Sequence, residues 1–227
     1  TDIEIQGGIW DGNTSGGSTS NGIALFGTNN QYIHDLTVQN CGGLASHGIY
    51  LGTNSSSFIS DGIYVDNVFC DNNYLGNEIA GPTTGLFTES ARNVNVSNFI
   101  GKNAVDGRGL AFTNVWRGHI SNAHAIHNIG GTGRGFDIGY GSHDVSLVNC
   151  FATGSSLDGF VIADSPGTDP ADRTQIVNCH AYNNGNNGFV VGGNECTIMG
   201  GSAYNNAFNG VRISVDQNHN VISWMVC

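Results

Sequence analysis

A glycine followed by alternating apolar residues recurs along the whole sequence, and this repeat constrains the fold more than any other feature. Short half-buried strands have this pattern, because successive side chains of a strand point to opposite faces. The repeat begins at Gly22, Gly48, Gly85, Gly109, Gly135, Gly159, Gly188 and Gly210. The intervals are 26, 37, 24, 26, 24, 29 and 22 residues, and repeats of roughly 20 to 50 residues are typical of solenoids.

A second signal lies between these glycines, an Asn, Asp or Gly that leads another short apolar segment. Its clearest copies begin at Asn67, Asn98, Asn122, Asn149 and Asn178. Asn and Gly readily adopt a left-handed backbone, so each marks a turn between two strands. Equivalent strands of successive coils must run parallel, because the chain always travels the same way round. We predict an all-β fold, a right-handed parallel β-helix of about eight coils with little or no helix.

Other repeat folds fit less well. A propeller blade needs four antiparallel strands, for which the repeat is too short, and the leucine-rich consensus is absent.

Two interruptions, Tyr74–Thr84 and Asp164–Arg173, are expected to be loops on one face. We predict one domain over residues 1–227 that lacks one or both polar caps, since the last residues, Val221–Cys227, are apolar. This indicates a processed or partial chain, or a homo-oligomer or end-to-end assembly.

Charge excludes some partners. The chain has 18 Asp and Glu against 7 Lys and Arg, a formal net charge of −11, which leaves too few cations for a nucleic-acid-binding face. No apolar run approaches the roughly 20 residues of a membrane-spanning helix. Six cysteines and three N-x-[ST] sequons favour an extracellular location.

One patch of the predicted outer surface concentrates the chemistry. Arg108 and Arg134 each precede a repeat glycine, so they lie on adjacent coils about 5 Å apart at the backbone. Asp137 faces outward beside them, with Asp158 one coil later and Glu89 one coil earlier. Stacked arginines repel each other unless an anion lies between them. The patch is therefore either a subsite for a carboxylate or sulfate of a sugar chain, or a local Arg–carboxylate network joining the coils.

Further candidate residues lie around this patch. His47 and Tyr50 are either an acid–base pair or an ordinary pair of outward side chains. Tyr140 follows the patch in sequence, and Asp164 lies in the second interruption. Trp116, like Tyr50, is a candidate for stacking on a sugar ring.

Other conspicuous residues have structural readings. Cys150 and Cys179 share an inward repeat position, as a disulfide or as two free thiols. The His, Cys and carboxylate spacings match neither a metal site nor a calcium loop, so no cofactor is predicted and calcium stays an open alternative without a motif. Four aromatic residues are expected to stack in the core: Phe112, Phe136, Phe160 and Phe189.

Part of the sequence resembles a known family. The segments Gly133–Tyr140, Leu157–Phe160, Ala181–Gly185 and Val105–Gly107 are similar to the catalytic modules of mannuronan (alginate) C5-epimerases and, more loosely, to β-helix polysaccharide lyases. The family segment Tyr-Gly-Phe-Asp-Pro-His places its Asp on Asp137, its Tyr on Arg134 and its His on Gly139. The family Lys falls on Ala104, with Lys102 nearest. The resemblance implies an acidic polysaccharide as the partner.

Three functions remain open. The first is a lyase or C5-epimerase, which needs a base and a group that neutralises the uronate carboxylate, in a groove over the Gly-led strand. Its candidate catalytic residues are Asp137, Arg134, Arg108, Tyr140 and His47, and its candidate substrate-binding residues are Tyr50, Glu89, Asp158, Asp164 and Trp116. The second is a glycoside hydrolase with paired carboxylates from Asp137, Asp158, Asp164 or Glu89. The third is a non-catalytic solenoid, such as an adhesin, a filament subunit or a phage-type receptor binder.

Overall fold

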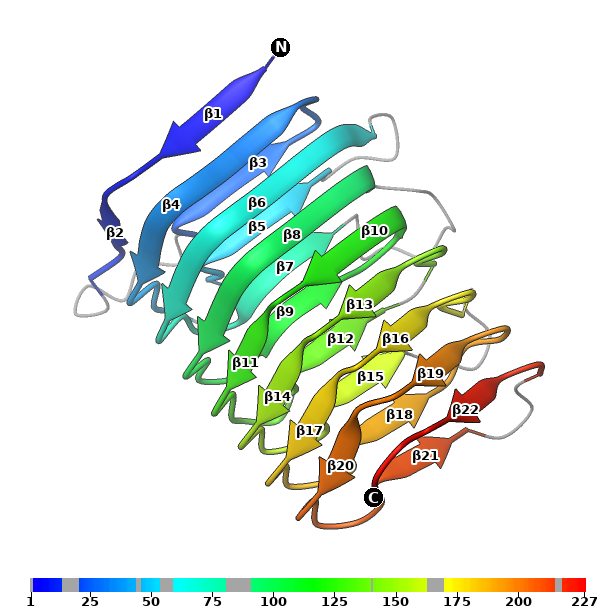
Figure 1. Ribbon diagram of the computed structural model, residues 1–227. Helices are drawn as coiled ribbons and strands as arrows, with labels where there is room; N and C mark the ends of the chain where they lie inside the picture. Colours follow the sequence, from blue (N-terminus) through cyan, green and yellow to red (C-terminus); the bar gives the residue numbers. More distant parts are fainter. Residues whose placement is uncertain are drawn as a thin grey trace.

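The computed structural model describes residues 2–13, 21–43, 46–53, 59–80, 91–139, 141–162, 170–214 and 218–227. In these residues the chain forms a parallel β-solenoid without a helix, which confirms the predicted all-β fold. The two termini lie at opposite ends of the stack (Figure 1). The chain runs along the near sheet and returns along the far sheet while it advances toward the C-terminus, which is right-handed winding (Figure 1).

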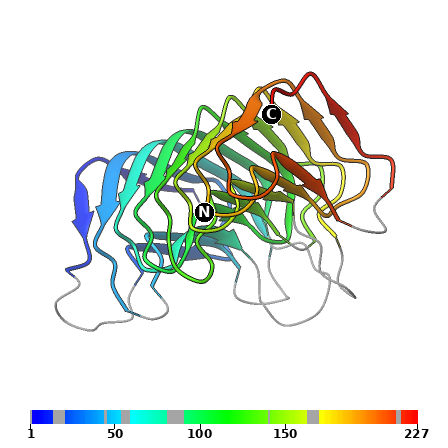
Figure 2. The same ribbon diagram turned by 90° about the horizontal axis from the view of Figure 1, so that it is seen from below.

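Each coil contributes strands to two sheets, a 14-stranded large sheet and an 8-stranded small sheet, so the predicted eight coils agree with the structure. Figure 2 shows the coils stacked one behind another. The large sheet contains β1 (Ile3–Gln6), β2 (Ile9–Asp11), β4 (Gln31–Gln39), β6 (Ser60–Asp71), β8 (Ala91–Lys102), β10 (Val115–Ser121), β11 (His124–Ile126), β13 (Ser146–Val148), β14 (Phe151–Thr153), β16 (Gln175–Val177), β17 (His180–Tyr182), β19 (Thr197–Met199), β20 (Ser202–Tyr204) and β22 (Val221–Ser223). The small sheet contains β3 (Ile23–Phe26), β5 (Ile49–Gly52), β7 (Gly76–Ala80), β9 (Arg108–Phe112), β12 (Phe136–Ile138), β15 (Phe160–Ile162), β18 (Phe189–Val191) and β21 (Val211–Ile213).

The large sheet bends in the middle of each coil at the left-handed residues predicted from the sequence. Their φ angles lie between 50° and 54°, a region in which asparagine costs less than most other residues. In the later coils the bend divides the strand in two, as between β10 and β11. The residues at this bend are Asn67, Asn98, Asn122, Asn149 and Asn178.

A second set of asparagines is buried where the large sheet turns into the small sheet. Asn184 Oδ1 accepts from the Ser155 backbone N–H at 3.1 Å, and its Nδ2 donates to the Ala152 carbonyl at 3.3 Å. Asn128 makes the equivalent pair of bonds one coil earlier, to the Ala104 N–H and the Gly101 carbonyl. These side chains supply partners that buried backbone groups at a tight corner would otherwise lack.

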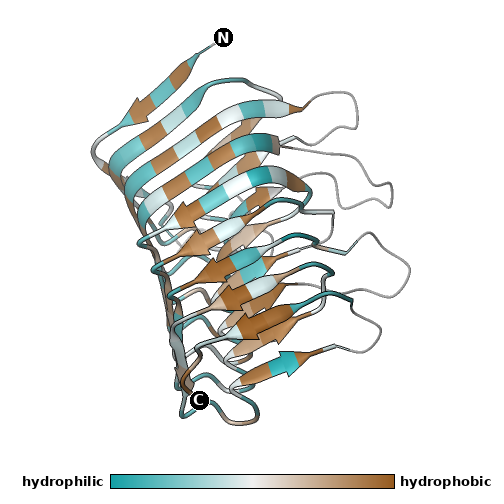
Figure 3. Cartoon of the chain, turned by 45° about the vertical axis from the view of Figure 1, so that its right-hand side comes forward, coloured by the Kyte–Doolittle hydropathy of each residue, from teal (hydrophilic) through white to brown (hydrophobic). Residues whose placement is uncertain are grey.

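The core lies between the two sheets and is built from ladders of like side chains. Hydrophobic and hydrophilic residues alternate along the strands (Figure 3). The rings of Phe136, Phe160 and Phe189 stack with centroids 5.0 and 4.8 Å apart. With Phe112 they are fully buried, as predicted. Cys150 and Cys179 stack as buried free thiols, with the Cys150 N–H 3.3 Å from the Cys179 sulfur.

The third coil of the small sheet differs from the prediction. Strand β7 pairs with β5 and β9, so Gly76 and not Gly85 leads this coil. The sequence template failed because Asn77 occupies an inward position where an apolar residue was expected. Its side chain is buried and satisfied, accepting from the Ile49 N–H and donating to the Gly109 carbonyl. The first predicted interruption is therefore partly strand.

The buried asparagines give a prediction about stability. Replacing Asn184 with Ala removes the acceptor of the buried Ser155 N–H and a donor to the Ala152 carbonyl, so we expect the free energy of unfolding to fall by about 2 kcal/mol or more. Urea denaturation followed by circular dichroism measures this. The exposed Asn95, replaced with Ala, is the control and should change stability by less than about 0.5 kcal/mol. Equal effects in the two variants would contradict a structural role for the buried amide.

Candidate functional site

Three of the predicted site residues form one ion-pair cluster on the small sheet, called here the Arg–Asp cluster: Arg108, Arg134 and Asp137. Asp137 Oδ2 lies 2.8 Å from Arg108 Nε and 2.7 Å from Arg134 Nη1. The Asp137 side chain is only 5% exposed, whereas those of the arginines are 30% and 31% exposed. The cluster therefore has a buried anion and a partly exposed cationic surface.

The parallel register places these three side chains together. Arg108 opens β9, and the Gly109 N–H donates to the Arg134 carbonyl at 3.0 Å, which puts the arginines on adjacent coils. Asp137 in β12 pairs with Ala111 in β9. The anion that two stacked arginines require is thus supplied by the protein itself. On the preceding coil, Gly76 lets β7 approach β9 closely, since a side chain there would overlap the Arg108 carbonyl oxygen.

The outward face of the small sheet is less open than the sequence predicted. Ala111, Asp137 and Val161 alternate outward as expected, yet all three are buried. Of the three residues on which the predicted groove was centred, Asp137 is buried, whereas Arg108 and Arg134 are partly exposed. For Asp137 the reason is visible, since both guanidinium groups bond to its carboxylate and shield it from solvent.

The second oxygen of the Asp137 carboxylate has a different environment. Asp137 Oδ1 is buried and has no hydrogen-bond partner among the described residues. Buried carboxylate oxygens normally accept at least one bond, and unsatisfied ones are uncommon. The Arg–Asp cluster thus retains one acceptor that its own arginines do not use.

A histidine–carboxylate pair lies on the preceding coils. His47 Nε2 is 3.1 Å from Glu78 Oε2, and Thr113 Oγ1 donates to Glu78 Oε1 at 3.1 Å. The Tyr50 ring stacks on His47 with centroids 4.6 Å apart, so His47 covers one face of that ring. The Phe26 ring meets the Tyr50 ring edge-on at 5.0 Å. His47 Nδ1 is buried and has no hydrogen-bond partner among the described residues.

Electrostatics connect the two groups. Burial raises the pKa of Glu78, but the hydrogen bond and charge of His47, the charge of Arg108 and the hydrogen bond from Thr113 outweigh it, so this pKa is below its ordinary value of 4.5. Burial and the charge of Glu78 raise the pKa of Tyr50. Glu78 was missed in the sequence because the third coil was assigned to Gly85; its place two residues after Gly76 was the available signal.

The remaining sequence candidates lie elsewhere. Asp158 Oδ1 accepts from the Asn187 backbone N–H at 3.0 Å and from its side chain at 2.7 Å, so it belongs to a ladder along the small sheet. Trp116 lies in β10 of the large sheet, where its Nε1 donates to the Gly141 carbonyl and its ring meets His143 edge-on. Three candidates lie outside the described residues: Tyr140, Glu89 and Asp164.

No three His, Cys, Asp or Glu side chains of the described residues gather closely enough to hold a metal ion. The described part of the chain also contains no helix that is long and apolar enough to cross a membrane.

Comparison with known proteins adds no family to this picture. No protein-family model matches the chain, and no curated protein matches it. The similarity to C5-epimerases and lyases therefore rests on the residues quoted above.

The lowered pKa of Glu78 gives a prediction about pH. A carboxylate with a lowered folded-state pKa stabilises the fold above the unfolded-state value of about 4.5, and this contribution is lost as pH falls through the folded-state value. We expect the difference in unfolding free energy between wild type and Glu78→Gln to be largest near neutral pH and to shrink below pH 4.5.

Urea denaturation at a series of pH values measures this difference. Glu4→Gln is the matched control, because Glu4 also contacts a histidine, His34, but its side chain is 66% exposed. Solvent screening should make the effect of Glu4→Gln small. A Glu78→Gln effect that grows toward acid would contradict the prediction.

Proposed function

We propose that this protein is an extracellular solenoid that binds an acidic polysaccharide along the small sheet and acts on it as a lyase or C5-epimerase. The observation that carries the proposal is the Arg–Asp cluster. Two of only seven basic residues in the chain gather there, with their guanidinium groups partly exposed above a buried carboxylate. Arginine binds carboxylate or sulfate groups through paired N–H donors, so the exposed edges suit an anionic sugar unit.

Both reactions begin with removal of the C5 proton of a uronate. The negative charge that develops on the carboxylate must be stabilised, which is the role proposed for Arg108 and Arg134. In a lyase the C4–oxygen bond then breaks and a C4–C5 double bond forms; in an epimerase a proton returns from the opposite face. His47, held by Glu78 at 3.1 Å, is the candidate base among the described residues.

The hydrolase alternative receives less support. A retaining or inverting hydrolase needs one carboxylic acid that stays protonated to donate to the leaving group. Asp137 is paired with two arginines, and the pKa of Glu78 is lowered. The lowered pKa of Glu78 favours its ionised form and disfavours a proton donor.

One observation favours a non-catalytic assembly as a second candidate. The last coil exposes large apolar side chains, with Phe208 at 73%, Trp224 at 84% and Val226 at 69%. Large apolar side chains exposed to solvent on the last coil are typical of surfaces that contact another protein segment. A solenoid that stacks through this surface would act as an adhesin or filament subunit.

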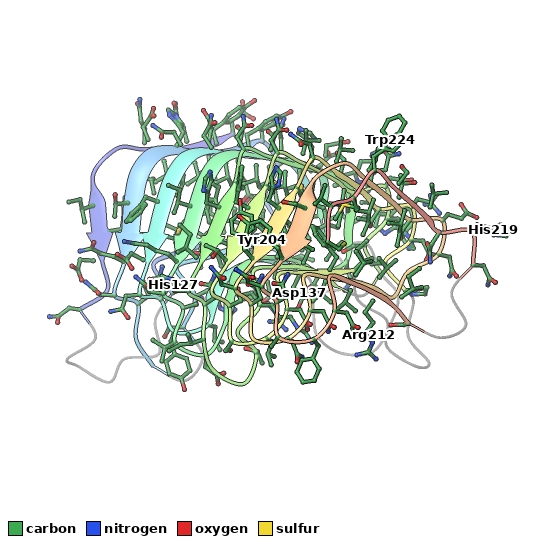
Figure 4. The ribbon with its side chains drawn as sticks, turned by 60° about the horizontal axis from the view of Figure 1, so that its bottom comes forward. His127, Asp137, Tyr204, Arg212, His219 and Trp224 are labelled. Atoms are coloured by element: carbon green, nitrogen blue, oxygen red, sulfur yellow. The ribbon has the colours of Figure 1, made fainter. Side chains whose placement is uncertain are left out.

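Substitutions in the Arg–Asp cluster test the first proposal. We expect Arg108→Ala combined with Arg134→Ala to weaken binding to polymannuronate about a hundredfold or more, because two charge-assisted contacts are lost. Isothermal titration calorimetry measures the affinity. Arg212→Ala is the matched control, since Arg212 lies exposed on β21 of the same sheet, toward its C-terminal end (Figure 4).

Asp137→Asn separates a subsite from a purely structural network. It removes the internal anion that competes for the arginines, so binding should be kept or strengthened. Unchanged affinity in the double arginine variant, with wild-type circular dichroism, would overturn the binding proposal. Lyase activity is followed by the ultraviolet absorbance of an unsaturated product, and epimerase activity by loss of the C5 proton signal in D₂O. If neither signal changes while the polysaccharide binds, the enzymatic part of the proposal is wrong and the protein only binds.

The second candidate has its own test. Replacing Phe208 and Trp224 with Ser should abolish any concentration-dependent association seen by sedimentation velocity, because it removes the two most exposed apolar side chains of the last coil. A wild-type chain that stays monomeric at all concentrations would contradict assembly through this surface.

A further inference from the structure

The outer edge of the large sheet carries a column of residues with a left-handed backbone. The type of residue in this column changes along the solenoid, from Asn or Gly to ionisable residues. The column lies near the start of each large-sheet strand, either within its first three residues or just before it, and successive members are in parallel register. We call it the corner column: Asn30, Gly62, Asn93, Arg117, Asp144, Arg173, Glu195 and His219.

The first three coils fill the corner column with the residues that suit it. Asn30, Gly62 and Asn93 have φ angles of 51°, 76° and 53°. From the fourth coil onward the same left-handed corner is occupied by ionisable residues: Arg117, Asp144, Arg173, Glu195 and His219. Arg117, for example, has a φ of 58°. Arg117, Arg173 and Glu195 are strained in this region compared with Asn or Gly, whereas Asp and His adopt it more readily. Strain of this kind concentrates at functional positions.

The charges in the later corner column alternate in sign. Arg173 forms a two-pronged ion pair with Asp144, with Nε–Oδ1 2.7 Å and Nη2–Oδ2 3.1 Å. Arg117 and Glu195 continue the alternation on either side, at one-coil spacing of about 4.8 Å. These four residues sum to no net charge, unlike the Arg–Asp cluster with its exposed cations.

An open hollow of about 430 Å³ lies beside this alternating segment. Its volume is in the range of small-ligand sites. Neither the Glu195 carboxylate nor the Gln175 amide hydrogen-bonds another described residue, and the Ser146 hydroxyl contacts His119 Nδ1 at 2.7 Å. The hollow is lined by Asp144, Val145, Ser146, Arg173, Gln175 and Glu195.

We propose that this hollow is a second binding site, separate from the Arg–Asp cluster, for an uncharged saccharide. The lining offers a carboxylate acceptor, an amide that both donates and accepts, and a hydroxyl. Sugar hydroxyls donate and accept in the same way, so they match this mixture. A polyanion would meet Asp144 and Glu195 as readily as Arg173, so the column gives it no net attraction.

The test exploits the residues of the early coils. Glu195→Asn restores at this corner the residue used at Asn30 and Asn93. We expect it to weaken binding of an uncharged oligosaccharide about tenfold while the melting temperature stays equal or rises. The probes are cellohexaose, xylohexaose and mannohexaose at millimolar concentration, followed by NMR titration and calorimetry. At least one should bind the wild-type protein.

His219→Asn is the matched control, because it makes the same change one coil further on, at a residue that does not line the hollow. It should leave binding unchanged. Gln175→Ala provides a variant outside the left-handed corner that should also lose binding, and it carries the test if Glu195→Asn does not fold. The double arginine variant of the small sheet should bind the uncharged probe normally, which separates this site from the proposed function.

Two results would overturn the proposal. One is the absence of binding for all three probes. The other is a Glu195→Asn variant that is less stable than wild type while Gln175→Ala binds normally, which would make the corner column a purely structural ion ladder.

Discussion

The solenoid depends on the way each coil turns its corners. A coil must reverse direction within a few residues while its backbone N–H and C=O groups remain paired with the coils above and below. Left-handed residues make the turn, and buried amides such as those of Asn128 and Asn184 bond the backbone groups that the turn would leave unpaired. The even stack of two parallel sheets follows from these corners.

Stacking at one-coil spacing then forces each side chain to accommodate its equivalents on both neighbouring coils. Apolar positions solve this with ring stacks, such as Phe136 on Phe160. The solvent-facing rings of His124, Phe151 and His180 also stack, with centroids 4.9 Å apart, so their faces are turned to one another. The same geometry limits Tyr50, whose ring faces His47. Charged positions need an opposite charge within the stack, as Asp137 provides for Arg108 and Arg134.

The sequence was sufficient for the fold and for part of the site. The glycine repeat and the left-handed asparagines predicted the parallel coils and their bends, because both are local backbone requirements. The pairing of Arg108 with Arg134 followed from their equal repeat positions. The third coil was misassigned because a buried, hydrogen-bonded Asn77 replaces an apolar residue, and Glu78 was lost with it. The burial of Asp137 and the corner column were not predictable, since both depend on which side chains meet across coils.

In a solenoid, a residue that differs from its equivalents on neighbouring coils indicates a position with a role beyond the fold. At a position where every coil needs a left-handed backbone, the residue type that adopts it with the least strain should recur. Asn recurs in this way at the bend of the large sheet. A charged residue in place of Asn adds strain without improving the turn. Arg173 and Glu195 are such residues, and the hollow lies beside them. The Arg–Asp cluster is a comparable departure on the small sheet, where Val161 and Val190 hold the equivalent positions of the next two coils. The Arg–Asp cluster lies on the small sheet and the charged part of the corner column lies on the large sheet, so the same repeating scaffold carries two separate polar regions.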